Sequence, residues 1–328
     1  MRGLELLYFL GQQMMYFSMP LLIVALGGLF SERSGVVNIA LEGIMVVGAL
    51  ASVLFIFLMQ QFTTISGNIL LLMALGIAAL AGIIYSLFHA YASINMKANQ
   101  VISGTALNLA ATPFAIFIGR LATGTVIGRT VQQIPFKNQF RISKVPFLGD
   151  IPYLGPLLFQ NAYITTYICL LILVFAWIVL FRTRFGLRLR ACGEHPQAAD
   201  SVGINVYKMR YAGVMISGAL AGIGGLVFVI PTSTNFNASV AGYGFLALAV
   251  LIFGQWNPWK VFAAAMFFGF MKTVSASSSS TSILSGLPIS SEVYKMIPYI
   301  ATLIVLVFSS KNSQAPKAAG EPYDQGAR

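Results

Sequence analysis

The chain has 328 residues, of which 57% are hydrophobic and only 9% are charged, and its formal net charge is +11. Soluble domains carry about 25% charged residues, so this composition excludes an ordinary water-soluble protein and predicts a polytopic membrane protein. The basic excess fits Lys and Arg retained in loops beside membrane spans, and we expect no nucleic-acid partner. Cys169 and Cys192 are too few for a disulfide framework.

Apolar runs of about 20 residues, long enough to cross a bilayer, predict an all-α bundle of transmembrane helices. Three further runs, two of them short, bring the total to roughly eight to ten spans. We expect residues 1–310 to form one membrane domain and the polar tail 311–328 to be disordered and cytoplasmic. The predicted spans lie at 9–30, 36–59, 69–94, 101–119, 161–181 and 211–230, with the further runs at 240–254, 258–274 and 292–309.

Polar side chains interrupt the apolar runs in three places. In SGVVNIALEG (34–43), Asn38 and Glu42 are four residues apart and share one face if the stretch is helical. Burying the Glu42 carboxylate in hydrocarbon costs on the order of 2.5–3.5 kcal/mol, so it should face protein or a water-filled cavity. The other two clusters are PTSTNFN (231–237) and ANQVISGTALNLA (98–110), which contains Asn99, Ser103 and Asn108.

Uncharged polar groups around a cavity suit a neutral, hydroxyl-bearing solute better than an ion. We therefore expect a solute path, with hydrogen bonding between helices as the alternative for each side chain. Whether residues 31–43 cross the membrane fully or form a broken, partly re-entrant helix stays open. The expected solute-path residues are Asn38, Glu42, Asn99, Ser103 and Asn108.

The loops 120–150 and 182–210 are both basic and lie on opposite sides of the membrane, because one predicted span separates them. In FRTRFGLRLR (181–190), four arginines directly follow a span. This pattern suits a cytoplasmic segment beside anionic lipid, so we place 182–210 in the cytoplasm.

A compact group of Cys192, Glu194 and His195 lies in this cytoplasmic loop. Metal ligands need spacings that let side chains converge, such as CxxC or HExxH, and a Cys–His nucleophile needs a base and an orienting group. Neither pattern is present, so we expect no catalytic residue, no metal site and no enzyme activity. The sequence also lacks a GxxxxGK[ST] phosphate-binding loop.

The residues that follow predict a short helix. Pro196 suits a first helical turn because its missing N–H would be unpaired there, and Gly203 suits a left-handed stop. An isolated helix of this length is marginal in water, so we expect a partner protein to hold it.

The segment GLRLRACGEHPQAADSVGINVYKMRYAGVMISGALAGIGG (186–225) resembles the permeases of ABC importers in the branched-chain amino acid, ribose and nucleoside group. His195 stands where that group often has Asn, which indicates a helix cap. SERSGVVNIALEGIMVVGALAS (31–52) and ANQVISGTALNLAA (98–111) resemble the nucleoside-type, or simple-sugar, permeases more closely than the amino-acid type. The matching loop residues are Gly186, Arg190, Ala191, Gly193, Pro196, Ala198, Ala199, Gly203 and Ile204.

This resemblance implies an all-α membrane domain of the type II fold, similar to vitamin B12 importers. It also implies an ABC ATPase subunit that binds ATP and Mg, a second permease subunit in a heterodimer, and an extracytoplasmic solute-binding lipoprotein. This chain itself would bind no cofactor. The loop helix would be the coupling helix, and we expect Ala198, Ala199 and Asp200 to form its docking face. The expected coupling residues are Arg190, Gly193, Pro196, Ala198, Ala199, Asp200 and Gly203.

The resemblance implies ATP-driven import of nucleosides or a related sugar-containing solute across the cytoplasmic membrane. Branched-chain amino acids or simple sugars are the alternative solutes. An ion-coupled secondary transporter is a further alternative, which would call for more intramembrane charges than Glu42.

Overall fold

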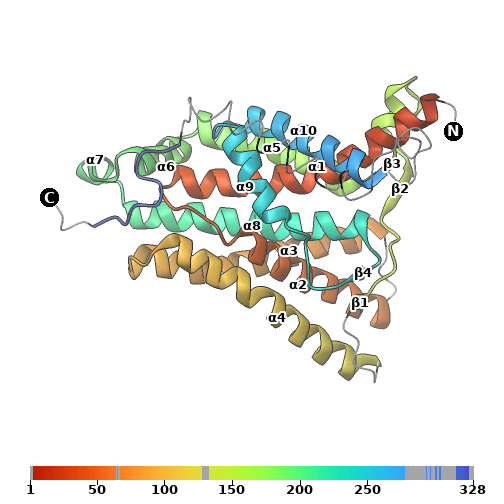
Figure 1. Cartoon of the computed structure of the whole chain (residues 1–328), viewed down its shortest axis with the longest axis horizontal. Helices are drawn as coiled ribbons and strands as arrows, with labels where there is room; N and C mark the ends of the chain where they lie inside the picture. Colours follow the sequence, from red (N-terminus) through yellow and green to blue (C-terminus); the bar gives the residue numbers. More distant parts are fainter. Residues whose placement is uncertain are drawn as a thin grey trace.

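The computed structural model describes residues 3–63, 65, 67–127, 133–277, 293, 296, 300, 303 and 315–324. It shows an all-α bundle in which six described helices are long and apolar enough to cross a membrane (Figure 1). The predicted spans are confirmed in this part of the chain, and the predicted run 292–309 falls largely outside the described residues. The six helices are α1 (Gly3–Arg33), α2 (Leu41–Phe62), α3 (Gly67–Ala90), α4 (Gln100–Ile127), α5 (Ile164–Arg182) and α8 (Val206–Thr232).

Helix α8 packs against α1, α2 and α3. Glycines allow this close approach: a Cβ added to Gly48 of α2 would overlap the backbone of Gly222 in α8, and one at Gly225 would overlap the carbonyl of Met45. Lipid tails are as apolar as the helices, so close van der Waals contact between small residues holds such helices together.

Two further helices pack in the bundle. α9 (Tyr243–Phe253) has 11 residues and is too short to cross a bilayer alone, whereas α10 (Pro258–Ser277) has 20. The turn between them contains Gln255 and Trp256 at positive φ angles of 47° and 53°. These helices correspond to the predicted runs 240–254 and 258–274.

The two ends of the bundle differ in structure (Figure 1). One end carries short antiparallel pairs: β1 (Ile134–Pro135) with β4 (Asn235–Phe236), and β2 (Arg141–Lys144) with β3 (Gln160–Tyr163). The opposite end carries α6 (Arg184–Glu194) and α7 (Pro196–Ser201). The two basic loops therefore lie at opposite ends, as predicted. Single-turn elements are η1 (Tyr91–Asn95), η2 (Leu148–Asp150) and η3 (Gly155–Phe159).

The polar tail is ordered over residues 315–324, contrary to the expectation of disorder for 311–328. It lies beside α6 and α7 (Figure 1), where the Ala318 N–H donates to the carbonyl of Gly193 at 2.9 Å. The Gly320 N–H donates to the carbonyl of Gly35 at 3.2 Å. Composition alone missed these contacts because their partners are distant in the sequence.

Candidate functional site

Residues 34–40, here named the broken segment, separate α1 from α2 and are not helical. The segment leaves α1 at Gly35, whose φ is +95°, and then runs back into the bundle along α8. Its Asn38 side chain is fully buried and donates to Ser217 Oγ of α8 at 2.9 Å. The predicted 36–59 helix therefore begins only at Leu41, and the stretch 31–43 is broken rather than a continuous crossing.

Side chains from α3 and α4 satisfy the backbone of the broken segment. The Val37 N–H donates to Gln100 Oε1 at 2.7 Å, and His89 Nε2 lies 3.0 Å from the Val37 carbonyl. In the membrane, non-helical backbone is tolerated only where protein or a water-filled cavity satisfies it. Sequence reasoning assigned no role to His89, although a histidine inside an apolar run was a visible signal.

Asn108 bonds the broken segment and the start of α2 with both ends of its amide. Its Nδ2 donates to the carbonyl of Ile39 at 2.8 Å, while its Oδ1 accepts from the N–H of Gly43 at 2.7 Å. An asparagine at this position therefore supplies both a donor and an acceptor to backbone groups that an unbroken helix would pair internally.

Glu42 joins two helix starts inside the bundle. It lies in the first turn of α2, and its carboxylate accepts from the N–H groups of Gly242 at 2.9 Å and Gly244 at 2.6 Å. Gly242 is the N-cap residue of α9, with φ +76°. Helix N-termini carry partial positive charge and unpaired N–H groups, so the two helix starts stabilise the carboxylate.

The remaining two predicted solute-path residues also bond within the protein. Asn99 caps α4, since its Oδ1 accepts from the N–H groups of Val101 and Ile102 at 2.9 and 3.2 Å. Ser103 Oγ lies 3.1 Å from His89 Nδ1. The structure thus brings Asn38, Glu42, Asn108 and, through His89, Ser103 around the broken segment. A role for these side chains in contacting solute stays a prediction.

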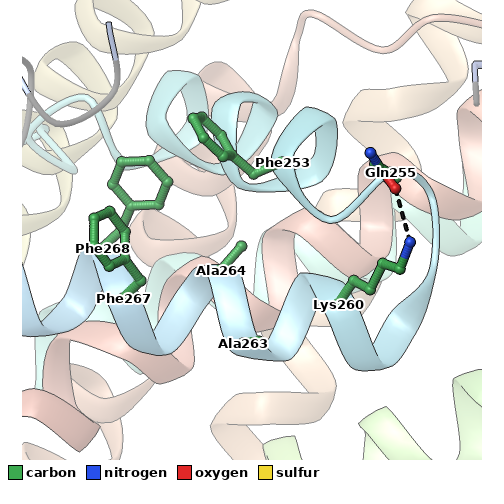
Figure 2. A pocket seen from close by; sticks show the side chains of 7 residues that line it. All are labelled: Phe253, Gln255, Lys260, Ala263, Ala264, Phe267 and Phe268. Carbon is green, nitrogen blue, oxygen red and sulfur yellow. Dashed lines mark hydrogen bonds between the residues drawn. The ribbon is translucent and has the colours of Figure 1, made fainter. Parts of the chain in front are cut away.

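Two hollows in the described part of the chain differ in chemistry. One of about 270 Å³ lies at the end of α8 near β4 and is lined by residues of the predicted PTSTNFN cluster, among them Thr232, Ser233 and Asn235. Hydroxyl and amide groups of this kind hydrogen-bond neutral polar molecules. The other, of about 410 Å³, is lined mainly by apolar residues of α9 and α10, and at one end Lys260 donates to Gln255 (Figure 2).

Helix α7 begins and ends where the sequence predicted. Pro196 is its first residue, and Gly203, at φ +81°, donates its N–H to the carbonyl of Asp200 at 2.9 Å. His195 occupies the N-cap position, as expected for a helix cap, although its side chain makes no cap hydrogen bond. Proline's fixed φ and missing N–H account for the helix start without such a bond.

The exposed face of α7 differs from the predicted docking face. Ala198 is exposed, whereas Ala199 is only 3% exposed and packs in a cluster with Cys192 and Val206. Asp200 is half-buried, and Val202, just after the helix, is 74% exposed. Ala199 therefore serves the chain's own core. The exposed residues on and beside α7 are His195, Gln197, Ala198, Ser201, Val202 and Gly203.

The Cys192, Glu194 and His195 side chains do not converge. Cys192 is buried, and this burial raises the pKa of its thiol to about 11, which keeps it protonated near neutral pH. The Glu194 carboxylate lies 3.5 Å from the Arg33 guanidinium, and His195 is exposed. Across the described part of the chain, no three His, Cys, Asp or Glu side chains gather as metal ligands would.

Two further predicted coupling residues have packing roles. The Arg190 guanidinium lies 4.9 Å from the ring centroid of Phe181, at the end of α5. Gly193 needs to lack a side chain because a Cβ there would overlap the carbonyl of Arg33. The loop is thus fixed directly onto the end of α1.

The chain matches the family described as "Branched-chain amino acid transport system / permease component" over residues 12–306. It is 44% identical over 315 residues to the guanosine ABC transporter permease protein NupQ of Bacillus subtilis, covering 95% of each chain. It is 39% identical over 313 residues to the nucleoside ABC transporter permease protein NupC of Lactococcus lactis, covering 94% of this chain and 95% of that protein.

A more distant similarity, 24% over 293 residues, joins it to the glucose ABC transporter permease protein TsgB13 of Haloferax volcanii, covering 88% of this chain and 73% of that protein. No solved structure shows significant similarity to the chain. The family match and the apolar helices together show that this is a multi-pass cell-membrane protein that belongs to the permease family of branched-chain amino acid transport systems.

Proposed function

We propose that the chain is the permease subunit of an ATP-driven ABC importer that takes up nucleosides. The observation that carries this proposal is the similarity to the guanosine and nucleoside permeases, which extends over nearly the whole length of both. The polar hollow near β4 supports a neutral, hydroxyl-bearing solute. Asn38, Glu42, Asn99, Ser103 and Asn108 are the proposed solute-path residues.

Helix α7 is the proposed coupling helix, and its exposed face meets the ATPase subunit. Ala198 and Val202 lie four residues apart on this surface, and a large apolar side chain that is 74% exposed, as Val202 is, suits a partner's groove. Beside it is a hollow of about 280 Å³ that Arg188 and Lys208 also line. An apolar contact flanked by cations favours an ATPase surface with an apolar groove and acidic residues at its edge.

A chain of contacts leads from α7 to the membrane interior. Glu194, just before α7, pairs with Arg33, and Arg33 Nη2 donates to the carbonyl of Trp256 at 3.1 Å. The Trp256 indole in turn donates to Glu32 Oε2 at 2.6 Å. A movement of α7 driven by the ATPase would therefore reach both the end of α1 and the α9–α10 turn. Alternating access requires such a connection between ATP binding and the solute cavity.

The complete transporter in this proposal has a second permease subunit as a heterodimer partner, an ABC ATPase that binds ATP and Mg, and an extracytoplasmic solute-binding lipoprotein. The 182–210 loop faces the cytoplasm. This chain contributes the path and the coupling helix and binds no cofactor itself.

The proposal is tested with the transporter assembled in vesicles. Uptake of labelled guanosine should exceed uptake of glucose or leucine, and it should stop on ATP depletion but survive collapse of the ion gradient. Dependence on the gradient would instead indicate a secondary transporter, and preference for leucine or glucose would indicate the alternative solutes of this family.

A docking variant tests the coupling helix separately. Ala198→Arg should remove the ATPase subunit from the purified complex while the permease still inserts, because a long cation would occupy the exposed face. Ala198→Ser is the matched control and should retain the ATPase. Undiminished co-purification of the ATPase with Ala198→Arg would contradict the assignment of this face.

A further inference from the structure

The tail residue Tyr323 fills a buried position at the base of α7. It is 4% exposed and belongs to the same apolar cluster as Cys192, Ala199 and Val206. Its ring packs edge-on against Tyr207 of α8, with the centroids 5.4 Å apart. The cluster therefore joins the loop, α7, the start of α8 and the tail. A buried aromatic ring contributes a large apolar area to such a cluster.

Beneath the tail lies a buried cation. Arg210 of α8 is 1% exposed; its Nη1 donates to the carbonyl of Glu321 at 2.9 Å, and its guanidinium carbon lies 5.9 Å from the Tyr323 ring centroid. Its Nε and Nη2 have no hydrogen-bond partner among the described residues. A buried charge is costly unless other groups compensate it, so the carbonyl and the aromatic face that the tail supplies are important to Arg210.

The same guanidinium touches the broken segment. It packs directly on Gly35, where an added Cβ would lie 3.0 Å from Arg210 Nη2. The tail reaches this segment independently through the bond from the Gly320 N–H to the Gly35 carbonyl. Arg210 and the tail thus hold Gly35 between them.

The tail also bonds both neighbouring elements. The Ala318 N–H donates to the carbonyl of Gly193, directly before α7. At the other end of the tail, Asp324 pairs with Lys97, in the turn between η1 and α4, at 2.8 Å. One short stretch of chain therefore connects the proposed coupling helix, the broken segment and the α3–α4 hairpin.

We propose that residues 315–324 form a clasp that makes α7 and the broken segment move as one body, with Tyr323 and Arg210 as its positioning residues. This inference rests on the proposed function, because α7 has to be the element that the ATPase moves. The clasp packs on the buried face of α7, which contains Ala199. The proposed ATPase contact uses the exposed residues Ala198 and Val202 instead. Losing it should leave the ATPase bound and break the transmission of its movement.

The experiment uses the assembled transporter with Tyr323→Ala, with a chain ending at residue 314, and with Tyr323→Phe, which keeps the ring. Lys317→Ala is the matched control, since this side chain is exposed and only its backbone N–H makes a described contact. ATPase co-purification, solute-stimulated ATP hydrolysis and uptake are measured for each. Tyr323→Ala and the shortened chain should keep the ATPase and lose uptake by about tenfold or more, whereas Tyr323→Phe and Lys317→Ala should match the wild type.

Cys192 provides a second measurement, because it is buried in the same cluster as Tyr323. In a Cys169→Ala background it is the remaining thiol, and its rate of maleimide labelling should rise about tenfold in Tyr323→Ala and stay unchanged in Tyr323→Phe. If Tyr323→Ala fails to accumulate, Tyr323→Leu takes its place, since it keeps an apolar side chain and loses the aromatic face over Arg210.

Wild-type or increased uptake by the shortened chain would overturn the clasp. A loss of uptake in Tyr323→Phe as large as that in Tyr323→Ala would also overturn the clasp, because the ring would then not be the positioning group. Failure of the wild-type permease to co-purify with an ATPase would instead refute the proposed function, and loss of the ATPase only in the Tyr323 variants would reassign the tail to docking.

Discussion

The two amide bonds of Asn108 give a quantitative test of how the broken segment is held. Asn108→Leu keeps a side chain of similar size and removes both the donor to the Ile39 carbonyl and the acceptor for the Gly43 N–H. Leaving a buried donor or acceptor unsatisfied costs about 1–3 kcal/mol, so the two together should lower the free energy of unfolding by about 2–6 kcal/mol.

A smaller loss of unfolding free energy would indicate that the Asn108 bonds resemble ordinary hydrogen bonds between transmembrane helices. Hydrogen bonds between side chains of transmembrane helices are worth only about 0.6 kcal/mol on average, because the unfolded state in the membrane also finds partners. Here one group is the carbonyl of Ile39, outside any helix, and the other is the N–H of Gly43 in the first turn of α2, so neither has an internal helical partner. We therefore expect the larger value.

The assay is unfolding of the purified permease in mixed micelles by a denaturing detergent, with nucleoside uptake measured in parallel. Thr105→Val is the matched control on the same helix: Thr105 is exposed and its hydroxyl donates only to the Val101 carbonyl one turn away, so the change should be within about 0.5 kcal/mol. The loss of unfolding free energy in Asn108→Asp should lie between those of Asn108→Leu and Thr105→Val, since Asp keeps the acceptor for the Gly43 N–H. A loss below about 1 kcal/mol for Asn108→Leu would refute the reasoning.

Three further predictions follow from neighbouring contacts. Glu42→Gln should retain an acceptor for one of the two α9 N–H groups, and Glu42→Ala should retain an acceptor for neither. Thermal stability should therefore decrease from the wild type to Glu42→Gln to Glu42→Ala, and equal stability of the two variants would contradict this. Gly225→Ala should cost about 1–3 kcal/mol of unfolding free energy, because the added methyl group would push α8 away from the backbone of Met45. Gly76→Ala, where no atom of another element lies within 4 Å of the added Cβ, should be neutral or slightly stabilising, and equal effects of the two changes would refute the packing argument. Folding raises the pKa of Cys192 from 9.0 to about 11, so the stability linked to its protonated thiol is present below pH 9 and is lost as the pH rises towards 11; a Cys192→Ala variant should lack this decline in thermal stability.

The long helices were predictable because length and apolar composition alone determine whether a segment can span a bilayer. The ends of α7 were also predictable, since Pro196 and Gly203 act through their own backbone geometry. The break at residues 34–40 could not be fixed in advance. VVNIA reads as part of an apolar run, and the groups that compensate its backbone, Gln100 and Asn108, lie on a different helix.

The docking face shows a second limit. Ala198 and Ala199 are identical in the sequence, and a six-residue helix is too short for an apolar period to separate them. What buries Ala199 is a cluster that includes Tyr323, from a tail whose polar composition indicated disorder. Composition describes what a segment can bury by itself, and it carries no information about an aromatic residue that fits a distant pocket.

The end of α1 is where the proposed movements meet. Arg33 contacts Glu194 and the Trp256 carbonyl, while Gly35, two residues later, contacts the tail and Arg210. Gly193 lies so close to the Arg33 backbone that even a methyl group would not fit, so this junction has no slack to absorb a displacement of α7. A shift of α7 must then move α1 and its neighbours together, and Glu42 extends the connection from α2 to the start of α9. Because α9 has only 11 residues, it can follow such a shift more readily than a helix that is anchored at both membrane faces.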